Sequence, residues 1–183
     1  MNVGGLDPGV RYCGVAVVTD RGIEESDLWT LPVQTTQACA RLHALLEAWI
    51  LSYNLEVVAV EDFHFHRQRG SVTTAKAMWQ ILGVVRSLAG YRDVEIMLVQ
   101  AGRWGRQLTG LRPPREQPGR RWDEWKRQVA WHVEREAGPS WSWVHDRAYH
   151  RRDSLGIAYY ARAEFRFQGQ VAGALAHRGK GRR

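Results

Sequence analysis

The chain has 183 residues, which is the size of one ordinary domain at roughly 100–200 residues. Its 26 Lys and Arg residues exceed its 19 Asp and Glu residues, which gives a net charge of +7, and 44% of its residues are hydrophobic. This composition excludes a chain that is disordered over its whole length and predicts a globular domain. The positive charge favours a polyanion or an acidic surface as the binding partner.

The chain has two cysteines, too few for a disulfide framework, and Cys13 and Cys39 lack the spacing of a zinc site, so we expect a reducing compartment. The first residues do not form a signal-peptide pattern, and no stretch approaches the ~18 consecutive apolar residues of a membrane span. We therefore expect a soluble, cytoplasmic protein that does not bind membranes.

Three short apolar runs at the start of the chain predict an antiparallel meander of strands. They cover residues 2–6, 12–18 and 23–33. The first two runs end at turn signals over residues 7–9 and 20–22, and strands joined by short turns pair in antiparallel fashion.

From residue 35 onward the hydrophobic period changes, and helices alternate with strands. The pattern predicts helices over residues 35–53 and 74–89, strands over 57–60 and 94–99, and a short helix that ends at Leu108. A strand–helix–strand crossover makes its two strands parallel. The expected fold class is therefore α/β: a mixed five-stranded sheet, with three antiparallel strands and then parallel strands, flanked by helices on both faces.

The helix over residues 74–89 is apolar on two sides, and such a helix must be covered on both. One stripe contains Ala75, Met78, Trp79, Leu82 and Val85, and the other contains Ala77, Ile81, Val84 and Leu88. In so small a domain, a second subunit is the expected cover for one of these stripes.

The second half of the chain contains a proline-rich loop over residues 111–119 and two further helices over residues 121–137 and 149–167. The last residues are rich in Gly and Arg. We therefore expect one folded domain over residues 1–167 and a basic, disordered tail over residues 168–183.

Four side chains that commonly bind metals occupy positions where the pattern predicts burial. Asp7 ends the first strand, and Glu61 ends an apolar strand, whereas Asp62 would point to the opposite face. His150 and Asp153 lie on the core-facing side of the final helix. Carboxylates brought together repel unless cations neutralise them. Oxygen ligands with one imidazole suit Mg²⁺ or Mn²⁺ better than zinc, so we expect a site for two such ions.

Each of these four residues also has a purely structural explanation. Asp7 can cap a turn, and Glu61 can pair with an arginine. His150 and Asp153 can satisfy free N–H groups in the first turn of a helix. Asp146 is a competitor for the metal site, because it precedes His150 by four residues and can lie on the same helix face.

Basic and aromatic residues cluster in two segments that suit contact with DNA, because arginine forks bind phosphates and aromatic rings stack on unpaired bases. The first segment directly follows Glu61, and its predicted DNA-binding residues are Phe63, His64, Phe65, Arg67 and Arg69. The second segment, residues 103–135, has nine basic residues against four acidic ones. Its predicted DNA-binding residues are Arg103, Arg106, Arg112, Arg115, Arg120 and Arg121.

The helix over residues 121–137 offers two interpretations. Trp122, Trp125 and Val129 belong to a helical stripe that favours core packing over base stacking. Lys126 enters the apolar side of this helix, where it either extends to the rim or serves the active site.

Three blocks of sequence resemble the catalytic blocks of the RuvC family of Holliday junction resolvases. They are GLDPGVR at residues 5–11, VEDF at residues 60–63 and HRRDSLGIA at residues 150–158, in the family's order and approximate spacing. The first block alone also resembles the opening of sugar kinases and actin-like ATPases. The three together are more specific, and the resemblance extends to about Arg166.

The resemblance implies an RNase H-like fold and a homodimer that binds a four-way DNA junction and cuts two opposing strands symmetrically with Mg²⁺ or Mn²⁺. By position, the four metal-ligand candidates would form the catalytic set, and His150 stands where some members have Asp and others His. Lys126 would steady charge that develops on the phosphate. A second helpful basic position falls on Arg106, where the family has lysine.

Other functions remain as alternatives. One is a different RNase H-like nuclease that acts on flapped DNA or RNA–DNA hybrids, and another is a catalytically inactive module that binds branched DNA. An ATPase of the actin and sugar-kinase type would need a second copy of the subdomain, for which 183 residues leave no room. We expect no small-molecule cofactor.

Overall fold

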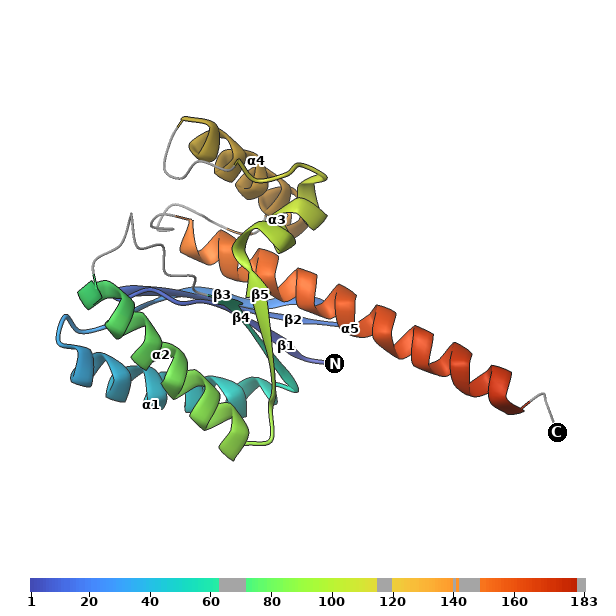
Figure 1. The fold of residues 1–183 in the computed structure, drawn as a ribbon, viewed down its shortest axis with the longest axis horizontal. Helices are drawn as coiled ribbons and strands as arrows, with labels where there is room; N and C mark the ends of the chain where they lie inside the picture. The colour runs from blue at the N-terminus through green and yellow to red at the C-terminus, as the bar shows by residue number, and fades with distance from the viewer. Residues whose placement is uncertain (63–71, 115–119, 140, 142–148, 181–183) are drawn as a thin grey trace.

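The fold is built on one mixed sheet of five strands (Figure 1). The computed structural model describes residues 1–62, 72–114, 120–139, 141 and 149–180. In sheet order the strands are β3 (Gly22–Thr30), β2 (Tyr12–Thr19), β1 (Val3–Asp7), β4 (Val57–Asp62) and β5 (Glu95–Gln100). The first three are antiparallel, whereas β4 runs parallel to both β1 and β5. The predicted mixed sheet is confirmed.

Helices cover both faces of this sheet, as predicted. On one face lie α1 (Thr35–Tyr53) and α2 (Val72–Tyr91) (Figure 1). On the other face lies α5 (His150–Lys180), and against it pack α3 (Ala101–Thr109) and α4 (Arg120–Ala137). The α3–α4 pair therefore lies over the start of α5, and the sheet lies beneath it.

The final helix is longer than the sequence predicted. It continues past Phe167 to Lys180, so residues 168–180, which we expected to be disordered, are helical. The physical reason is that the segment extends a helix that is already formed, and it contains no proline that would end it. The division into a domain over 1–167 and a separate tail stays a prediction. Among the described residues, no helix has the length and apolar character needed to cross a membrane.

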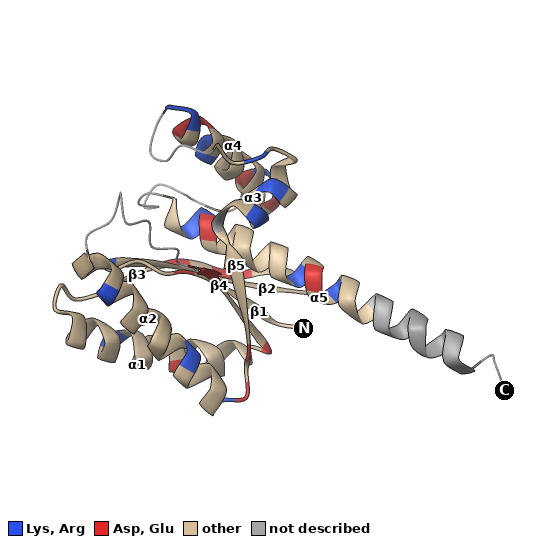
Figure 2. Ribbon diagram, in the orientation of Figure 1, with Lys and Arg blue, Asp and Glu red and all other residues tan. Residues whose placement is uncertain are grey.

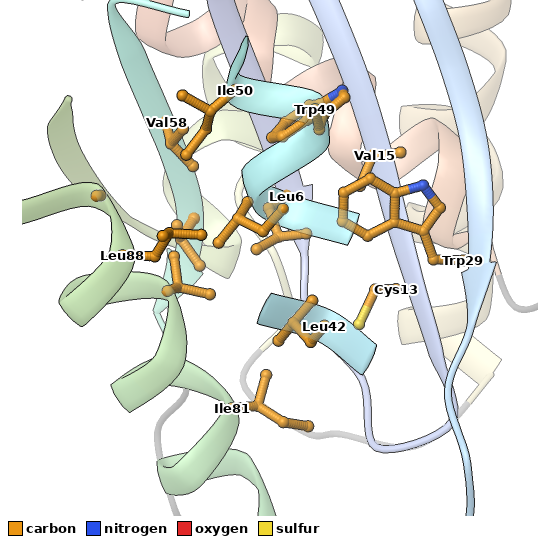
Figure 3. Packing of buried hydrophobic residues seen from close by; sticks show 14 of the residues in the cluster. Leu6, Cys13, Val15, Trp29, Leu42, Trp49, Ile50, Val58, Ile81 and Leu88 are labelled. Carbon is orange, nitrogen blue, oxygen red and sulfur yellow. The ribbon is translucent and has the colours of Figure 1, made fainter. Parts of the chain in front are cut away.

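The central strands bury side chains on both faces, which explains their continuous apolar runs. Leu6, Val15 and Val58 pack with α1 and α2 around Leu42 and Ile81 (Figure 3). Strand residues at alternate positions pack on the opposite face: Val3, Val57, Ala59 and Val99 join residues of α3, α4 and α5. The two-residue period of a strand thus divides the core into two layers.

Two glycines allow the backbone of α5 to approach the sheet very closely. A Cβ atom on Gly5 of β1 would lie 2.0 Å from the carbonyl oxygen of Ser154, and one on Gly14 of β2 would lie 1.9 Å from that of His150. Because real side chains do not tolerate such distances, only glycine fits at these points. The glycines therefore determine where the first turn of α5 lies.

Helix α2 does not bury all of its apolar residues within this chain. Eight of its residues are buried, but Trp79, which we assigned to an apolar stripe, is 56% exposed. Val72 is also exposed, and a Cβ atom on Gly83 or Gly90 would meet no atom of the described residues within 4 Å. The helix packs one broad face against α1 and the sheet, and apolar side chains outside that face, Val72 and Trp79, are exposed on the surface.

Candidate active site

Two acidic residues meet at the carboxyl ends of the parallel strands β1 and β4. Leu6 pairs with Val60 in the register, so the next residues, Asp7 and Glu61, are neighbours at the same edge. Both follow residues that face α1 and α2, so the pleat turns both side chains toward α5. Asp7 is buried and Glu61 is partly exposed.

The first turn of α5 adds an imidazole and a third carboxylate. The ring atom Nδ1 of His150 lies 2.5 Å from Oδ2 of Asp7. Asp153 is buried one turn further along, and its backbone N–H donates to the carbonyl oxygen of Tyr149 at 2.8 Å. The close approach of α5 to the sheet thus brings both helix residues to the strand ends.

A lysine from α4 completes this group. The Nζ atom of Lys126 donates to Oδ2 of Asp153, and the lysine side chain is only 17% exposed. The side chain therefore does not extend to the rim of the protein, which was the structural alternative. It lies instead among the carboxylates.

Crowding of the carboxylates shifts their acidity. Burial and the neighbouring Asp7 raise the pKa of Glu61 to about 8, although Lys126 opposes this. Burial also raises the pKa of Asp153 to about 6, although the positive charge of Lys126 acts to lower it. Burial acts to lower the pKa of Lys126, but the surrounding carboxylates outweigh it, so its pKa is raised above the ordinary value. The site carries more negative charge than a single ammonium group neutralises.

This charge excess leads to a prediction for stability in the presence of a chelator. The pKa values of Glu61 (about 8) and Asp153 (about 6) lie above the ordinary carboxyl values of about 4. The folded state therefore binds more protons than the unfolded state across this range, so stability is full at low pH and is lost as pH rises through the folded-state values. We expect Tm to fall between about pH 5 and about pH 8.5. Calorimetry should show a smaller fall for Glu61→Gln, and identical profiles would contradict the assignment.

The donor set suits a hard divalent cation. Three carboxylates and one imidazole provide oxygen ligands with one nitrogen, and Mg²⁺ and Mn²⁺ prefer such sets. The raised pKa values of Glu61 and Asp153 indicate a local shortage of positive charge, which a bound cation would relieve. In the part of the chain that is described, no group of three or more His, Cys, Asp or Glu side chains is arranged so that it could hold a metal ion without rearrangement. His150 contacts an oxygen of Asp7, and Lys126 contacts an oxygen of Asp153. A bound cation would use these same oxygens.

Trp104 belongs to this site, although the sequence predicted no role for it there. It lies on α3 and is fully buried, and its Nε1–H donates to Oε1 of Glu61 at 3.5 Å. The order of the elements could have indicated this position. Helix α3 directly follows β5, and β5 is the parallel neighbour of β4, so the first turns of α3 lie beside the end of β4, where Glu61 is.

Two arginines of α5 hold the first turn of that helix in place. Arg151 donates from Nε and Nη2 to the carbonyl oxygen of Ser26 on β3, at 3.1 and 2.6 Å. Arg152 donates from Nε to Oε1 of Glu134 on α4 at 2.5 Å. These contacts fix the start of α5 between the sheet and α4.

The predicted DNA-binding arginines that the structure describes lie on the surface. They are Arg103, Arg106, Arg112, Arg120 and Arg121, all exposed, on α3, the loop after it and the start of α4. Figure 2 shows the basic positions of α3 and α4 on the same side of the sheet as the start of α5. The predicted residues Phe63, His64, Phe65, Arg67, Arg69 and Arg115, and the competitor Asp146, lie outside the described residues.

Comparisons with known proteins agree with this architecture. The chain matches the family model of the crossover junction endodeoxyribonuclease RuvC over residues 3–111. The structure of T. thermophilus RuvC in complex with Holliday junction substrate is similar, with 23% identity, 89% of this chain and 96% of that chain covered, and a TM-score of 0.68. The yeast mitochondrial Holliday junction resolvase Ydc2 is similar with 14% identity, 93% and 80% coverage and a TM-score of 0.55. No curated protein gives a significant match.

The family match spans more than half of the chain and includes Asp7, Glu61 and Trp104. The two solved structures extend the likeness of fold across most of the remainder, which contains the second half of the site. The resemblance inferred from the three sequence blocks and the RNase H-like fold class are both confirmed. This chain belongs to the RuvC family of crossover junction endodeoxyribonucleases.

Proposed function

We propose that the chain resolves four-way DNA junctions by cutting two opposing strands at symmetric positions. The observation that carries this proposal is the meeting of Asp7, Glu61, His150 and Asp153 at one end of the sheet, beside Lys126. The substrate class is supported by the similar T. thermophilus RuvC, which was solved with a Holliday junction.

Nucleases of the RuvC family depend on divalent metal ions. In this chain the ions would be Mg²⁺ or Mn²⁺, two per site, held by the three carboxylates and His150. When bound, such ions polarise the phosphate, activate a water and stabilise the leaving oxygen. Glu61 must be ionised to serve as a ligand. The ammonium group of Lys126 would leave Asp153 to contact a phosphate oxygen and stabilise the charge that develops there.

Symmetric cutting requires two active sites, and resolvases of this family are dimers. The outer side of α2 is the surface we assign to the second subunit. It presents the exposed apolar side chains Val72 and Trp79 beside the open positions at Gly83 and Gly90. Small residues permit close approach between two helices, and covering exposed apolar side chains favours association. We further propose that the dimer acts in the cytoplasm.

The exposed arginines of α3 and α4 would hold the arms of the junction. Each neutralised phosphate contributes about −0.9 to the slope of log affinity against log salt concentration. We expect the double change Arg120→Ala and Arg121→Ala, at the start of α4, to reduce the size of this slope by about 2. Fluorescence anisotropy with a labelled junction in a chelator would measure it. Arg21→Ala, at the exposed β2–β3 turn, is the control and should leave the slope unchanged.

The experiment that tests the proposed function compares substrates of the same sequence in different architectures. Synthetic four-way junctions, Y-shaped duplexes and RNA–DNA hybrids are incubated with Mg²⁺, and the products are mapped to single nucleotides. We expect paired nicks at symmetric positions in the junction alone. Preferred cleavage of flapped DNA or hybrids would replace the proposal with a different RNase H-like nuclease, and binding without cleavage in Mg²⁺ and Mn²⁺ would identify an inactive binding module.

A further inference from the structure

We propose that Trp104 is a positioning residue that holds both Glu61 and Lys126 in their reactive arrangement. This inference rests on the proposed function, because it assigns a role within the same site. The effect of Trp104 would pass through the two residues that it contacts, Glu61 and Lys126.

The first contact is with Glu61. The indole Nε1–H of Trp104 donates to Oε1 of this carboxylate at 3.5 Å. A hydrogen bond of this kind favours the ionised form of a carboxylate, which is the form that binds cations. It also selects one orientation of the carboxylate, as outer partners of metal ligands do.

The second contact is with Lys126. Its Nζ atom lies 5.8 Å from the centroid of the Trp104 ring, within the range of a cation–π attraction. When the lysine leaves Asp153 to meet a phosphate, the face of the indole remains as a second site of attraction. One side chain thus contacts both a candidate ligand and the candidate electrostatic catalyst.

The indole has little freedom to move away from these contacts. Trp104 is fully buried, and a Cβ atom placed on Gly156 of α5 would lie 2.4 Å from its Cζ3 atom. The Trp104 ring therefore fits against α5 in a socket at Gly156, which is open because glycine has no side chain. Because Gly156 is three residues after Asp153, the socket is part of the same stretch of α5 that carries the site.

A neighbouring tryptophan provides a natural comparison. Trp125 on α4 is also buried, and its indole Nε1–H has no hydrogen-bond partner among the described residues. It has a socket of its own, since a Cβ atom on Gly105 would lie 2.6 Å from its Cζ2 atom. Trp125 thus has the burial and packing of Trp104 without the contact to Glu61.

The experiment compares Trp104→Phe with Trp125→Phe in the DNA-free protein. Isothermal titration calorimetry with Mn²⁺ gives the Kd for the metal alone, without depending on cleavage. We expect Trp104→Phe to raise this Kd by about 10- to 100-fold, the usual effect of removing a partner of a metal ligand. Trp125→Phe should change it by less than about threefold, although both variants lower Tm because both lose buried indole area. Junction binding in a chelator should be the same for both.

A second pair of variants keeps every tryptophan and tests the inference even if Trp104→Phe fails to fold. Gly156→Ala displaces the Trp104 ring, and Gly105→Ala displaces the Trp125 ring to a similar extent. We expect only Gly156→Ala to weaken Mn²⁺ binding. Equal effects within either pair would overturn the role of Trp104 while leaving the proposed function intact. Failure of the wild-type protein to bind Mn²⁺ or to cleave a junction would instead count against the proposed function.

Discussion

Replacing Asp7 by Asn is expected to lower the rate of junction cleavage by more than about 100-fold. Changes to residues that merely orient a metal ligand already cost 10–100-fold, so loss of a ligand charge should exceed that. Asp7 lies between the two halves of the site, in contact with His150 of α5 and beside Glu61 of β4. Its replacement therefore affects both His150 and Glu61 directly.

The same substitution should not destabilise the protein. Asp7 raises the pKa of Glu61 through like-charge repulsion, and Asn removes that repulsion while it keeps the side-chain volume. We expect Tm in a chelator to stay level or to rise. Single-turnover cleavage of a four-way junction with Mg²⁺ measures the rate, and calorimetry measures Tm. Asp62→Asn is the matched control, because Asp62 occupies the same strand end but alternates to the other face. Equal rates for wild type and Asp7→Asn would contradict the assignment.

Replacing Gly14 by Ala is expected to impair both stability and cleavage. The added Cβ atom would lie 1.9 Å from the carbonyl oxygen of His150, a backbone atom that cannot turn aside. The first turn of α5 must therefore move away from β2, and His150 and Asp153 must move with it. Overpacking of this kind typically costs about 1–3 kcal/mol, which lowers Tm by about 2–4 °C per kcal/mol in a domain of this size.

The control for Gly14→Ala is Gly169→Ala on α5, where a new Cβ atom would meet no described residue within 4 Å. That change should stabilise the helix slightly, by up to about 1 kcal/mol, and leave cleavage unchanged. Thermal unfolding and single-turnover cleavage are measured on both variants. A Gly14→Ala protein with wild-type Tm and wild-type rate would show that α5 does not depend on this close approach.

Much of the architecture could be predicted from local patterns. The two-residue period of the strands, the turns over residues 7–9 and 20–22, and the alternation of strands and helices after residue 35 led to the mixed sheet that the structure contains. The same patterns placed Asp7 and Glu61 at the ends of strands that proved to be parallel neighbours. These features follow from periodicity and chain connectivity, which act over short stretches of sequence.

Other features depended on contacts between elements, and local patterns did not reveal them. Trp79 is exposed although it lies in an apolar stripe, because the orientation of α2 on the sheet decides which side turns inward. The end of α5 lies beyond Phe167, since no proline follows that would end a helix already formed. The sequence left open whether Lys126 extends to the rim or serves the active site. Its contact with Asp153 of α5 places it in the site, and this contact joins two different helices.

The sequence by itself therefore predicted the fold class and the family, which are confirmed, and proposed four metal ligands, because each depends on residue type and on spacing along the chain. The tertiary structure alone decided how those residues meet. Asp7 and His150 are 143 residues apart, and their contact at 2.5 Å exists because two glycines let α5 lie directly on the sheet. Trp104, which donates to Glu61, lies in turn against a third glycine, Gly156. Such contacts arise from the shapes of packed surfaces, which no local period of the sequence encodes.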